Sequence, residues 1–234
     1  LQGTGQWGYE RSHGSLGRDS MTVPRLRVIG AIGLCVALVA LNAIFVQAAT
    51  YPAASCSAAD VAAAVVLAAN GDTVTIPAGT CDWTAGITIA KAIVLQGAGA
   101  GQTIIRDAPV ANGDYRLITW TLVANQTSRM TGIEFQNNGR TAELDRGAIF
   151  IGGSLTRDQR RMRIDSCVFT DLYQHTLETF SAYGVFDSNT ATTIGTRYLA
   201  FKGRASAADF GDTAWFTATD FGTAWFFYVE DNTI

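Results

Sequence analysis

Beyond residue 72 the chain alternates short apolar runs with turn residues, in the two-residue period that is typical of β-strands. Residues 73–76 and 103–105 are rich in β-branched side chains, and residues 77–79 and 97–101 punctuate them with Gly and Pro. No long amphipathic helical segment interrupts the series, although a TIM barrel or a doubly wound fold requires such segments between its strands. The pattern therefore predicts an all-β protein.

One segment ahead of these strands has helical spacing instead. Ser57, with Asp60 three residues later, forms the pattern that caps a helix start, and Gly71 provides a left-handed stop. Four apolar residues recur on one face of the helix between them: Val61, Ala64, Val65 and Ala68. We expect a short α-helix within residues 57–70.

The strand region contains a weak internal repeat, because residues 161–169, 183–191 and 226–234 align in one register. Two inward columns result: Met130, Ile164, Phe186 and Val229 in the first, and Phe135, Phe169, Ala191 and Ile234 in the second. Equivalent positions are 34, 22 and 43 residues apart. One coil is therefore expected to take about 22 residues, which is short for a solenoid, and the last interval is expected to hold two coils.

The same register places Asn189 and Asn232 at one corner of the coils, with Cys167 at the equivalent position of the coil before. Stacked Asn side chains hydrogen-bond along the axis of a stack, as amide ladders do between other parallel strands. We therefore expect an asparagine ladder at this corner.

The helix over residues 57–69, the turn at 70–72 and the strands at 73–76, 93–97 and 103–105 resemble the N-terminal cap and first coils of the pectate-lyase-like superfamily. The resemblance implies a right-handed parallel β-helix, a single-stranded solenoid whose N-terminal helix caps its open end. It also implies a role connected with polysaccharides. The paired Asp and Gly-His-Gly set of polygalacturonases and the Arg-rich signature of pectate lyases are absent, so the resemblance names no enzyme.

Residues 21–48 have the form of a secretory signal helix. Arg25 and Arg27 precede an apolar run without charges, and the small residue Ala48 offers a cleavage site at its end. An uncleaved membrane anchor is the alternative, since such an anchor needs roughly 17 to 25 residues. No basic cluster follows the run, which favours cleavage. Membrane contact is expected only through this segment.

The leader sets the expected organisation of the chain. Residues 1–20 are interpreted as upstream sequence, and residues 49–234 as one β-helix domain, secreted into the periplasm or the extracellular space. Ile234 falls inside a strand motif with no polar capping element after it, so we expect the β-helix to continue beyond this sequence. The domain is expected to be a monomer.

Three cysteines follow the leader, and an oxidising compartment favours a disulfide among them. Cys56 lies just before the predicted helix and Cys81 just after the first strand, so a Cys56–Cys81 bridge would tie the cap to the first coil. Cys167 is then expected to be a buried free thiol, and its spacing matches no zinc motif.

The charge balance excludes one class of partner. The chain carries 17 Lys and Arg against 20 Asp and Glu, and removal of the leader would leave 13 against 18. A nucleic-acid-binding surface needs a basic face to neutralise phosphates, so nucleic acid is not expected as a partner.

Asp165, Asp187 and Glu230 form an outward column in the same register. Stacked carboxylates about 4.8 Å apart would raise one another's pKa. They would suit the acid and base of a glycoside hydrolase, or a calcium ion that neutralises a uronate, and calcium is the one cofactor this column suggests. A solvated acidic ladder is the alternative, because the expected extra coil would separate Asp187 from Glu230.

Arginines precede this column, in a cluster that includes Arg161 and Arg163. Arginine forks match uronate carboxylates, and Arg163 is the candidate substrate clamp, with a charged loop that needs no ligand as the alternative. His175 is a candidate general base near neutral pH, although a lone His is more often an exposed polar residue. Tyr228, beside Glu230, is the candidate stacking platform for a sugar.

Other aromatic residues are further candidates for sugar platforms: Trp120, Trp215, Trp225 and Phe227. Alternation along the last segment predicts that Trp225, Phe227 and Val229 point inward, and that Phe226, Tyr228 and Glu230 point outward.

Two hypotheses about function follow. The first is a secreted β-helix protein that binds, and as a lyase or hydrolase depolymerises, an acidic polysaccharide. The second is a non-catalytic surface or matrix protein of the adhesin type, whose long side binds glycan or another protein.

Overall fold

The computed structural model describes residues 47–108, 116–141, 148–153, 158–172, 175–192, 198–202 and 226–234. These residues belong to one compact unit, Gln47–Ile234. The predicted upstream sequence and the signal helix as far as residue 46 lie outside the described residues, as do Trp215 and Trp225.

Three sheets make up this unit, and all neighbouring strands in them run parallel. Sheet A has, in order, β1 (Thr50–Pro52), β2 (Thr73–Ile76), β5 (Val94–Gly97), β8 (Thr127–Thr131), β11 (Arg161–Asp165), β14 (Tyr183–Asp187) and β17 (Phe227–Glu230). Sheet B has β3 (Gly79–Trp83), β6 (Thr103–Asp107), β9 (Glu134–Asn137), β12 (Val168–Thr170) and β15 (Thr190–Thr192). Sheet C has β4 (Ile87–Ile89), β7 (Ile118–Thr121), β10 (Ile149–Gly152), β13 (His175–Phe180) and β16 (Tyr198–Lys202).

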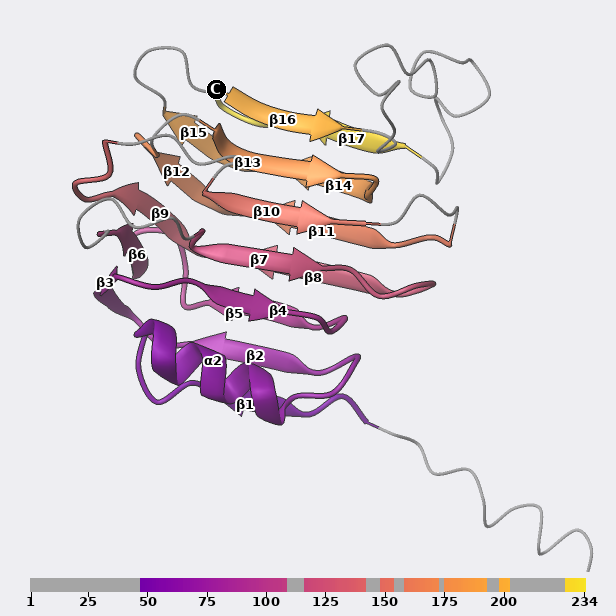
Figure 1. Ribbon diagram of the computed structural model, residues 1–234, viewed down its shortest axis with the longest axis horizontal. Coiled ribbons are helices and arrows are strands. Elements are labelled where there is room, and N and C mark those ends of the chain that lie inside the picture. Colours follow the sequence, from indigo (N-terminus) through magenta and orange to yellow (C-terminus); the bar gives the residue numbers. More distant parts are fainter. Residues whose placement is uncertain are drawn as a thin grey trace, which may run out of the picture. The chain divides into compact units, whose positions relative to one another are not determined.

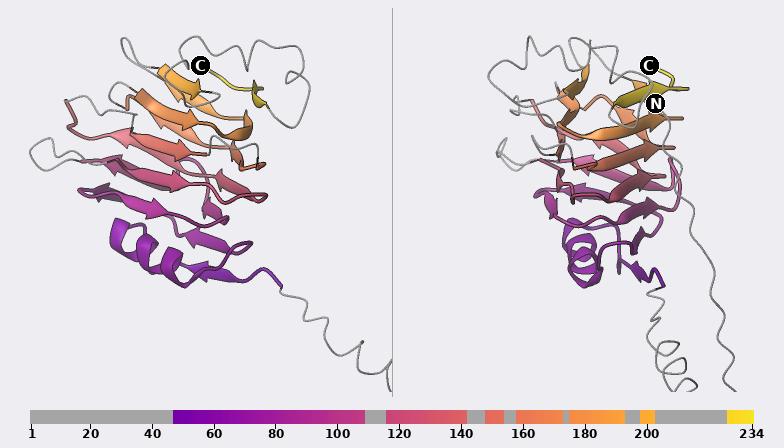
Figure 2. Two further views of the ribbon diagram at one scale, coloured as in Figure 1. Left: turned by 45° about the vertical axis from the view of Figure 1, so that its right-hand side comes forward. Right: turned by 90° about the vertical axis from the view of Figure 1, so that its right-hand side faces the viewer.

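From β2 to β17 the chain visits sheets A, B and C in a fixed rotation, so each turn of the chain adds one strand to each sheet. Figure 1 and Figure 2 show the strands stacked in sequence order, from indigo to yellow. The prediction of an all-β protein is confirmed. Parallel strands in stacked sheets are also consistent with the predicted parallel β-helix.

Both predicted inward columns are confirmed by the strand register. Ile164 is the partner of Met130 on one side and of Phe186 on the other, and all three side chains are fully buried. In the second column the rings of Phe135 and Phe169 stack with centroids 5.7 Å apart. Apolar side chains at alternate strand positions thus fill the interior because the register brings like residues together.

The columns are less protected at β17. Val229 continues the first column as the partner of Phe186, yet it is 46% exposed, and Ile234 is 77% exposed. Within the described residues no strand of sheet A lies beyond β17, so nothing there covers these side chains.

The prediction that two coils separate β14 from β17 is wrong. β14 pairs directly with β17, with Phe186 opposite Val229 and Asp187 opposite Glu230. One coil, with β15 and β16, therefore occupies the interval, and residues 203–225 lie outside the described residues. The number of residues between two strands does not distinguish an extra coil from an insertion in a single coil, because both lengthen the interval.

The predicted helix is α2 (Ala58–Leu67), and Ser57 is its N-cap. The Ser57 hydroxyl accepts a hydrogen bond from the backbone N–H of Asp60 at 3.2 Å, as the sequence predicts. The reciprocal half of the motif differs. The Ser57 N–H donates to the hydroxyl of Ser55, which in turn donates to the Asp60 carboxylate. Asp is shorter than the usual Glu, and Ser55 bridges the gap.

The end of α2 is held by a lysine from the next coil. The Lys91 ammonium donates to the carbonyl oxygens of Val65 and Val66 at 2.8 Å each, and to that of Ala68 at 2.5 Å. A cation at this end also complements the helix dipole. The helix ends at Leu67, earlier than the sequence predicts, and it packs against β1, β2 and β4.

Asp72 fixes the turn that follows the helix. Its carboxylate accepts hydrogen bonds from the backbone N–H groups of Ala69 at 2.7 Å and Ala49 at 2.8 Å. The bond from Ala69, followed by that from Ala49, lowers the pKa of Asp72. The carboxylate thus joins the strand that enters the unit to the turn after α2.

The predicted disulfide between Cys56 and Cys81 is present, with Cα atoms 5.7 Å apart. It joins the residue before the Ser57 cap to β3 of the first coil. Cys167 is a free, buried thiol, as predicted, and burial raises its pKa to about 12. A thiol of this kind is a packing residue rather than a nucleophile.

We expect Ile164→Asp to lower the free energy of unfolding by about 3–5 kcal/mol, because it places an unpaired charge in the fully buried first column. Urea unfolding followed by circular dichroism measures the change. Ile164→Val is the matched control and should cost only about 0.5–1.5 kcal/mol. Equal stability of the Asp variant and the parent would refute the inward column.

Candidate functional site

The predicted carboxylate column lies on the outer face of sheet A. Asp165 on β11, Asp187 on β14 and Glu230 on β17 are consecutive register partners, so no coil separates any two of them. The residue before Asp165 in this column is Thr131 on β8. The expected separation of Asp187 from Glu230 is therefore wrong, and the three acids occupy three adjacent strands.

A second outward column runs beside the first, two residues earlier on each strand. It consists, in order, of Val94, Arg129, Arg163, Val185 and Tyr228. Successive side chains on one face of a strand are two residues apart, so the two columns point to the same side of sheet A. The face therefore presents two adjacent arginines beside the acids.

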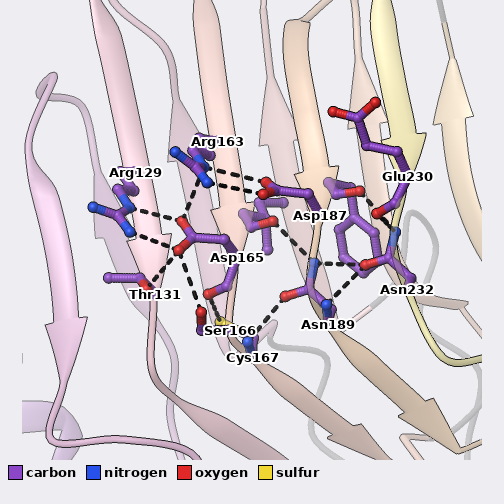
Figure 3. Close-up of polar contacts among 12 residues, drawn as sticks. Arg129, Thr131, Arg163, Asp165, Ser166, Cys167, Asp187, Asn189, Glu230 and Asn232 are labelled. Atoms are coloured by element: carbon purple, nitrogen blue, oxygen red, sulfur yellow. Dashed lines mark hydrogen bonds and ion pairs between the residues drawn. The ribbon is translucent and has the colours of Figure 1, made fainter.

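Each arginine pairs with the acid of the following coil, as Figure 3 shows. Arg129 Nε and Nη2 donate to the two carboxylate oxygens of Asp165 at 2.7 and 2.6 Å. Arg163 Nε and Nη2 donate to those of Asp187 at 3.2 and 2.8 Å. Both pairs have the two-bond geometry that fixes the plane of a guanidinium group. We call these four residues the Arg–Asp ladder.

Asp165 links the two pairs into one network. Its carboxylate lies 3.4 Å from Arg163 Nε and also accepts a hydrogen bond from the Thr131 hydroxyl at 3.0 Å. The Asp165 and Asp187 side chains are 4% and 14% exposed, whereas those of Arg129 and Arg163 are 41% and 47% exposed. The acids thus lie beneath the guanidinium groups, which make up most of the exposed part of the ladder.

The expectation that stacking would raise the pKa of the carboxylates is wrong for Asp165. Burial acts to raise the pKa of Asp165, but the hydrogen bonds from Arg129 and Thr131 and the charges of Arg129 and Arg163 outweigh it. Its pKa therefore lies below the ordinary value. The same pairing raises the pKa of Arg129 and of Arg163, chiefly through the hydrogen bonds to Asp165 and Asp187 respectively.

Glu230 has no arginine of its own within the described residues. The position from which an arginine would reach it, by the stagger of the ladder, is occupied by Val185. Its side chain is exposed, and in Figure 3 no dashed line joins its carboxylate to the residues drawn. The third predicted acid is therefore the one whose charge the ladder leaves uncompensated.

The predicted asparagine ladder lies directly beyond the carboxylate column and is confirmed. The side-chain oxygen Oδ1 of Asn189 accepts a hydrogen bond from the backbone N–H of Cys167 at 2.9 Å, and Oδ1 of Asn232 accepts one from the backbone N–H of Asn189 at 2.9 Å. The Asn189 amide also donates to Ile164 O at 2.9 Å. Each side chain thus bonds the backbone of a neighbouring coil, which fixes the height of the acids two residues earlier.

The corner itself needs left-handed residues. Ser166, Ser188 and Asp231 precede the three ladder positions, with φ of 54°, 56° and 53°. Short polar residues tolerate this conformation better than most, so the sharp corner is repeated without glycine. The corner aims both outward columns in one direction on successive coils.

Of the remaining predicted site residues, Arg161 and Tyr228 lie on sheet A, and His175 does not. Arg161 begins β11, two residues before Arg163, and its side chain donates to Gln159 in the segment before that strand. His175 begins β13 in sheet C, a different sheet from the carboxylates, and its side chain lies outside the description. Tyr228 is on the outer face, as predicted, and its ring meets that of Phe226 edge-on at 5.3 Å.

Two of the other aromatic residues belong to the core. Phe227 is 2% exposed, as alternation predicts. Trp120 is fully buried, and its indole N–H donates to Lys91 O at 3.0 Å, so its interpretation as a sugar platform is wrong.

Arg129 is the site residue that the sequence analysis missed. The alignment of Met130 with Ile164 also aligns Arg129 with Arg163, so the signal was present in the same register. The ion pair of Asp107 and Arg140 was missed as well. Both side chains are fully buried, with Arg140 Nε 2.5 Å from an Asp107 oxygen, and this pair serves the interior rather than the surface.

The described residues contain neither a cluster suited to a metal ion nor a helix suited to a membrane. No group of three or more His, Cys, Asp or Glu side chains there is arranged to hold a metal ion. Likewise, none of the helical structure in the described part of the chain is long and apolar enough to cross a membrane.

Comparisons with protein-family models, with curated proteins and with solved structures found no match. Any inference about function therefore has to come from the geometry of the Arg–Asp ladder.

The lowered pKa of Asp165 predicts a pH-dependent contribution to stability. Asp165→Asn should lower the free energy of unfolding at pH 7 by about 1–3 kcal/mol, through lost charge-assisted hydrogen bonds. A carboxylate with a lowered pKa stabilises above its unfolded pKa, and this contribution disappears as the pH falls through the folded value. The gap between parent and variant should therefore close below pH 3.8.

Urea unfolding of both proteins between pH 7 and pH 2 measures this gap. Other acids, including Asp72, contribute equally to both proteins and cancel in the difference. A gap that is constant over the whole range would contradict the lowered pKa of Asp165.

Proposed function

We propose that this protein is a secreted parallel β-helix protein of the pectate-lyase-like type, which binds an acidic polysaccharide along the outer face of sheet A. In this proposal the β-helix is right-handed and α2 caps its N-terminal end. Residues 21–48 direct secretion. The disulfide between Cys56 and Cys81 is consistent with an oxidising, extracellular compartment.

The observation that carries the proposal is the layered arrangement of the Arg–Asp ladder. The recessed acids hold Arg129 and Arg163 through Nε and Nη2, and no bond joins either Nη1 to a described residue. Each Nη1 has two N–H donors, and each arginine side chain is more than two-fifths exposed. A carboxylate on a sugar therefore meets oriented donors rather than acids.

The same arrangement favours binding over acid–base catalysis at this column. A glycosidase needs one protonated carboxyl group and one free carboxylate at the scissile bond. Asp165 has both oxygens in hydrogen bonds and a lowered pKa, and Asp187 has both oxygens bonded to Arg163. The catalytic roles of Asp165, Asp187, Glu230 and His175 stay predictions, and a turnover measurement tests them.

The expected affinity for a single sugar is low. An exposed ion pair contributes only about 0–1 kcal/mol, so two arginines give a weak contact. A polymer offers the same surface many overlapping binding registers, and several protein copies engage one chain. The interaction should also weaken with salt, because the guanidinium groups are solvent-accessible.

We expect Arg129→Gln and Arg163→Gln to lower the affinity for pectate by roughly twofold to fivefold each, because each removes one exposed charge contact. Affinity electrophoresis in gels with pectate measures the change, with neutral dextran as the ligand control. Arg106→Gln is the matched protein control, since Arg106 is also exposed and pairs with Asp82 at 2.6 Å, but lies on sheet B.

The same samples are followed for unsaturated products and reducing ends, with and without calcium. Product formation that Asp187→Asn abolishes would restore the enzyme hypothesis. Binding that is lost equally in Arg106→Gln and Arg163→Gln would show a non-specific charge effect and would refute the proposed site.

A further inference from the structure

We propose that the outer face of sheet A recognises a run of two consecutive negative charges with uncharged units on either side. This inference rests on the proposed function and specifies its ligand: a uronate polymer in which free carboxylates occur in short pairs, separated by esterified or neutral sugars.

The second outward column of sheet A, here called the arginine column, has two charged residues on the described strands. Val94, Arg129, Arg163, Val185 and Tyr228 follow one another on five adjacent strands of sheet A. Adjacent parallel strands are about 4.8 Å apart, so the two arginines are separated by one strand spacing. Uncharged side chains stand before and after them. The column therefore offers two cationic positions and no more.

The guanidinium groups of Arg129 and Arg163 are held rigidly. Each guanidinium group is bound by two hydrogen bonds to an acid of the next coil, and Asp165 contacts both arginines. Figure 3 shows both groups reaching in the same direction from their strands. The separation between the free Nη1 donors is therefore set by the sheet and the acids, and a ligand does not have to order them.

Toward β17 the arginine column continues with an apolar and an aromatic residue. Val185 and Tyr228 replace further arginines, and Tyr228 packs edge-on against Phe226. An apolar and aromatic surface suits the uncharged face of a sugar ring. The exposed carboxylate of Glu230, which no described arginine compensates, lies in the neighbouring column at the same strand as Tyr228. A third negative charge on the ligand would meet that carboxylate and be repelled.

The experiment uses galacturonate tetrasaccharides on the intact secreted protein. One ligand has all four carboxylates free, and the other has the two central carboxylates free and the outer two methyl-esterified. Binding is measured by NMR titration or calorimetry at low salt. We expect the parent to bind the partly esterified ligand at least as tightly as the fully charged one, although the latter carries twice the charge.

Val185→Arg is the decisive variant. By the stagger of the ladder its side chain would reach Glu230, as Arg129 reaches Asp165 and Arg163 reaches Asp187. The substitution would thus add a third cationic position and cancel the repulsive charge. We expect it to reverse the preference, so that the fully charged ligand binds roughly twofold to fivefold more tightly than the partly esterified one.

Glu230→Gln is a second variant that adds no new side-chain volume. It removes the repulsion alone, so it should raise the affinity for the fully charged ligand and leave that for the partly esterified ligand unchanged. Circular dichroism checks that both variants keep the fold of the parent.

The outcomes separate the inference from the proposed function. A parent that prefers the fully charged ligand, or variants that leave the preference unchanged, would overturn the two-charge inference while binding through Arg129 and Arg163 still stands. If neither ligand binds, or if Arg163→Gln has no effect on either, the proposed function fails and the inference fails with it.

Discussion

The parallel register of sheet A is the constraint on which the rest of the structure depends. Backbone hydrogen bonding holds each strand at one fixed height above the last, so residues that are 22 or 43 positions apart become direct neighbours. This spacing stacks Ile164 on Phe186 inside the coil, and it brings Arg163 within reach of Asp187 outside it. Core and surface therefore share one alignment, and a shift of register would disrupt both.

Two arrangements of Arg–Asp pair among the described residues differ in exposure, and this difference separates their roles. Asp107 and Arg140 are fully buried, so their charges are compensated only by protein groups, and removing either would leave an unpaired charge in the interior. The pairs of the Arg–Asp ladder are layered instead, with the acid covered and the arginine accessible. The first arrangement contributes to structure alone, whereas the second leaves donors available to a ligand.

Much of the fold was predictable because one repeat was recognised. Aligning residues 161–169 with 183–191 placed Ile164, Asp165 and the asparagine corner correctly, since a single register fixes every column at once. The disulfide between Cys56 and Cys81 was also predicted, because the expected oxidising compartment and the positions of the two cysteines favour it.

The contacts that the sequence did not reveal are made by long side chains that extend to a neighbouring coil. The bond from Arg129 to Asp165 crosses one coil and one column, and the capping of α2 by Lys91 spans more than 20 residues. Neither distance follows from a repeat. The pKa of Asp165 was misjudged for the same reason: the alignment showed the neighbouring acids but not the arginine that lies across them.

The connection between β16 and β17 has a consequence for how such a chain changes over time. Residues 203–225 separate these strands, yet Asp187 and Glu230 still meet in register, so a connection of this length is compatible with the parallel alignment of the sheet. The entropy of closing a loop grows only slowly with its length, which makes additions at such a point tolerable. Sequence inserted between β16 and β17 during evolution can therefore leave the outer face of sheet A unaltered.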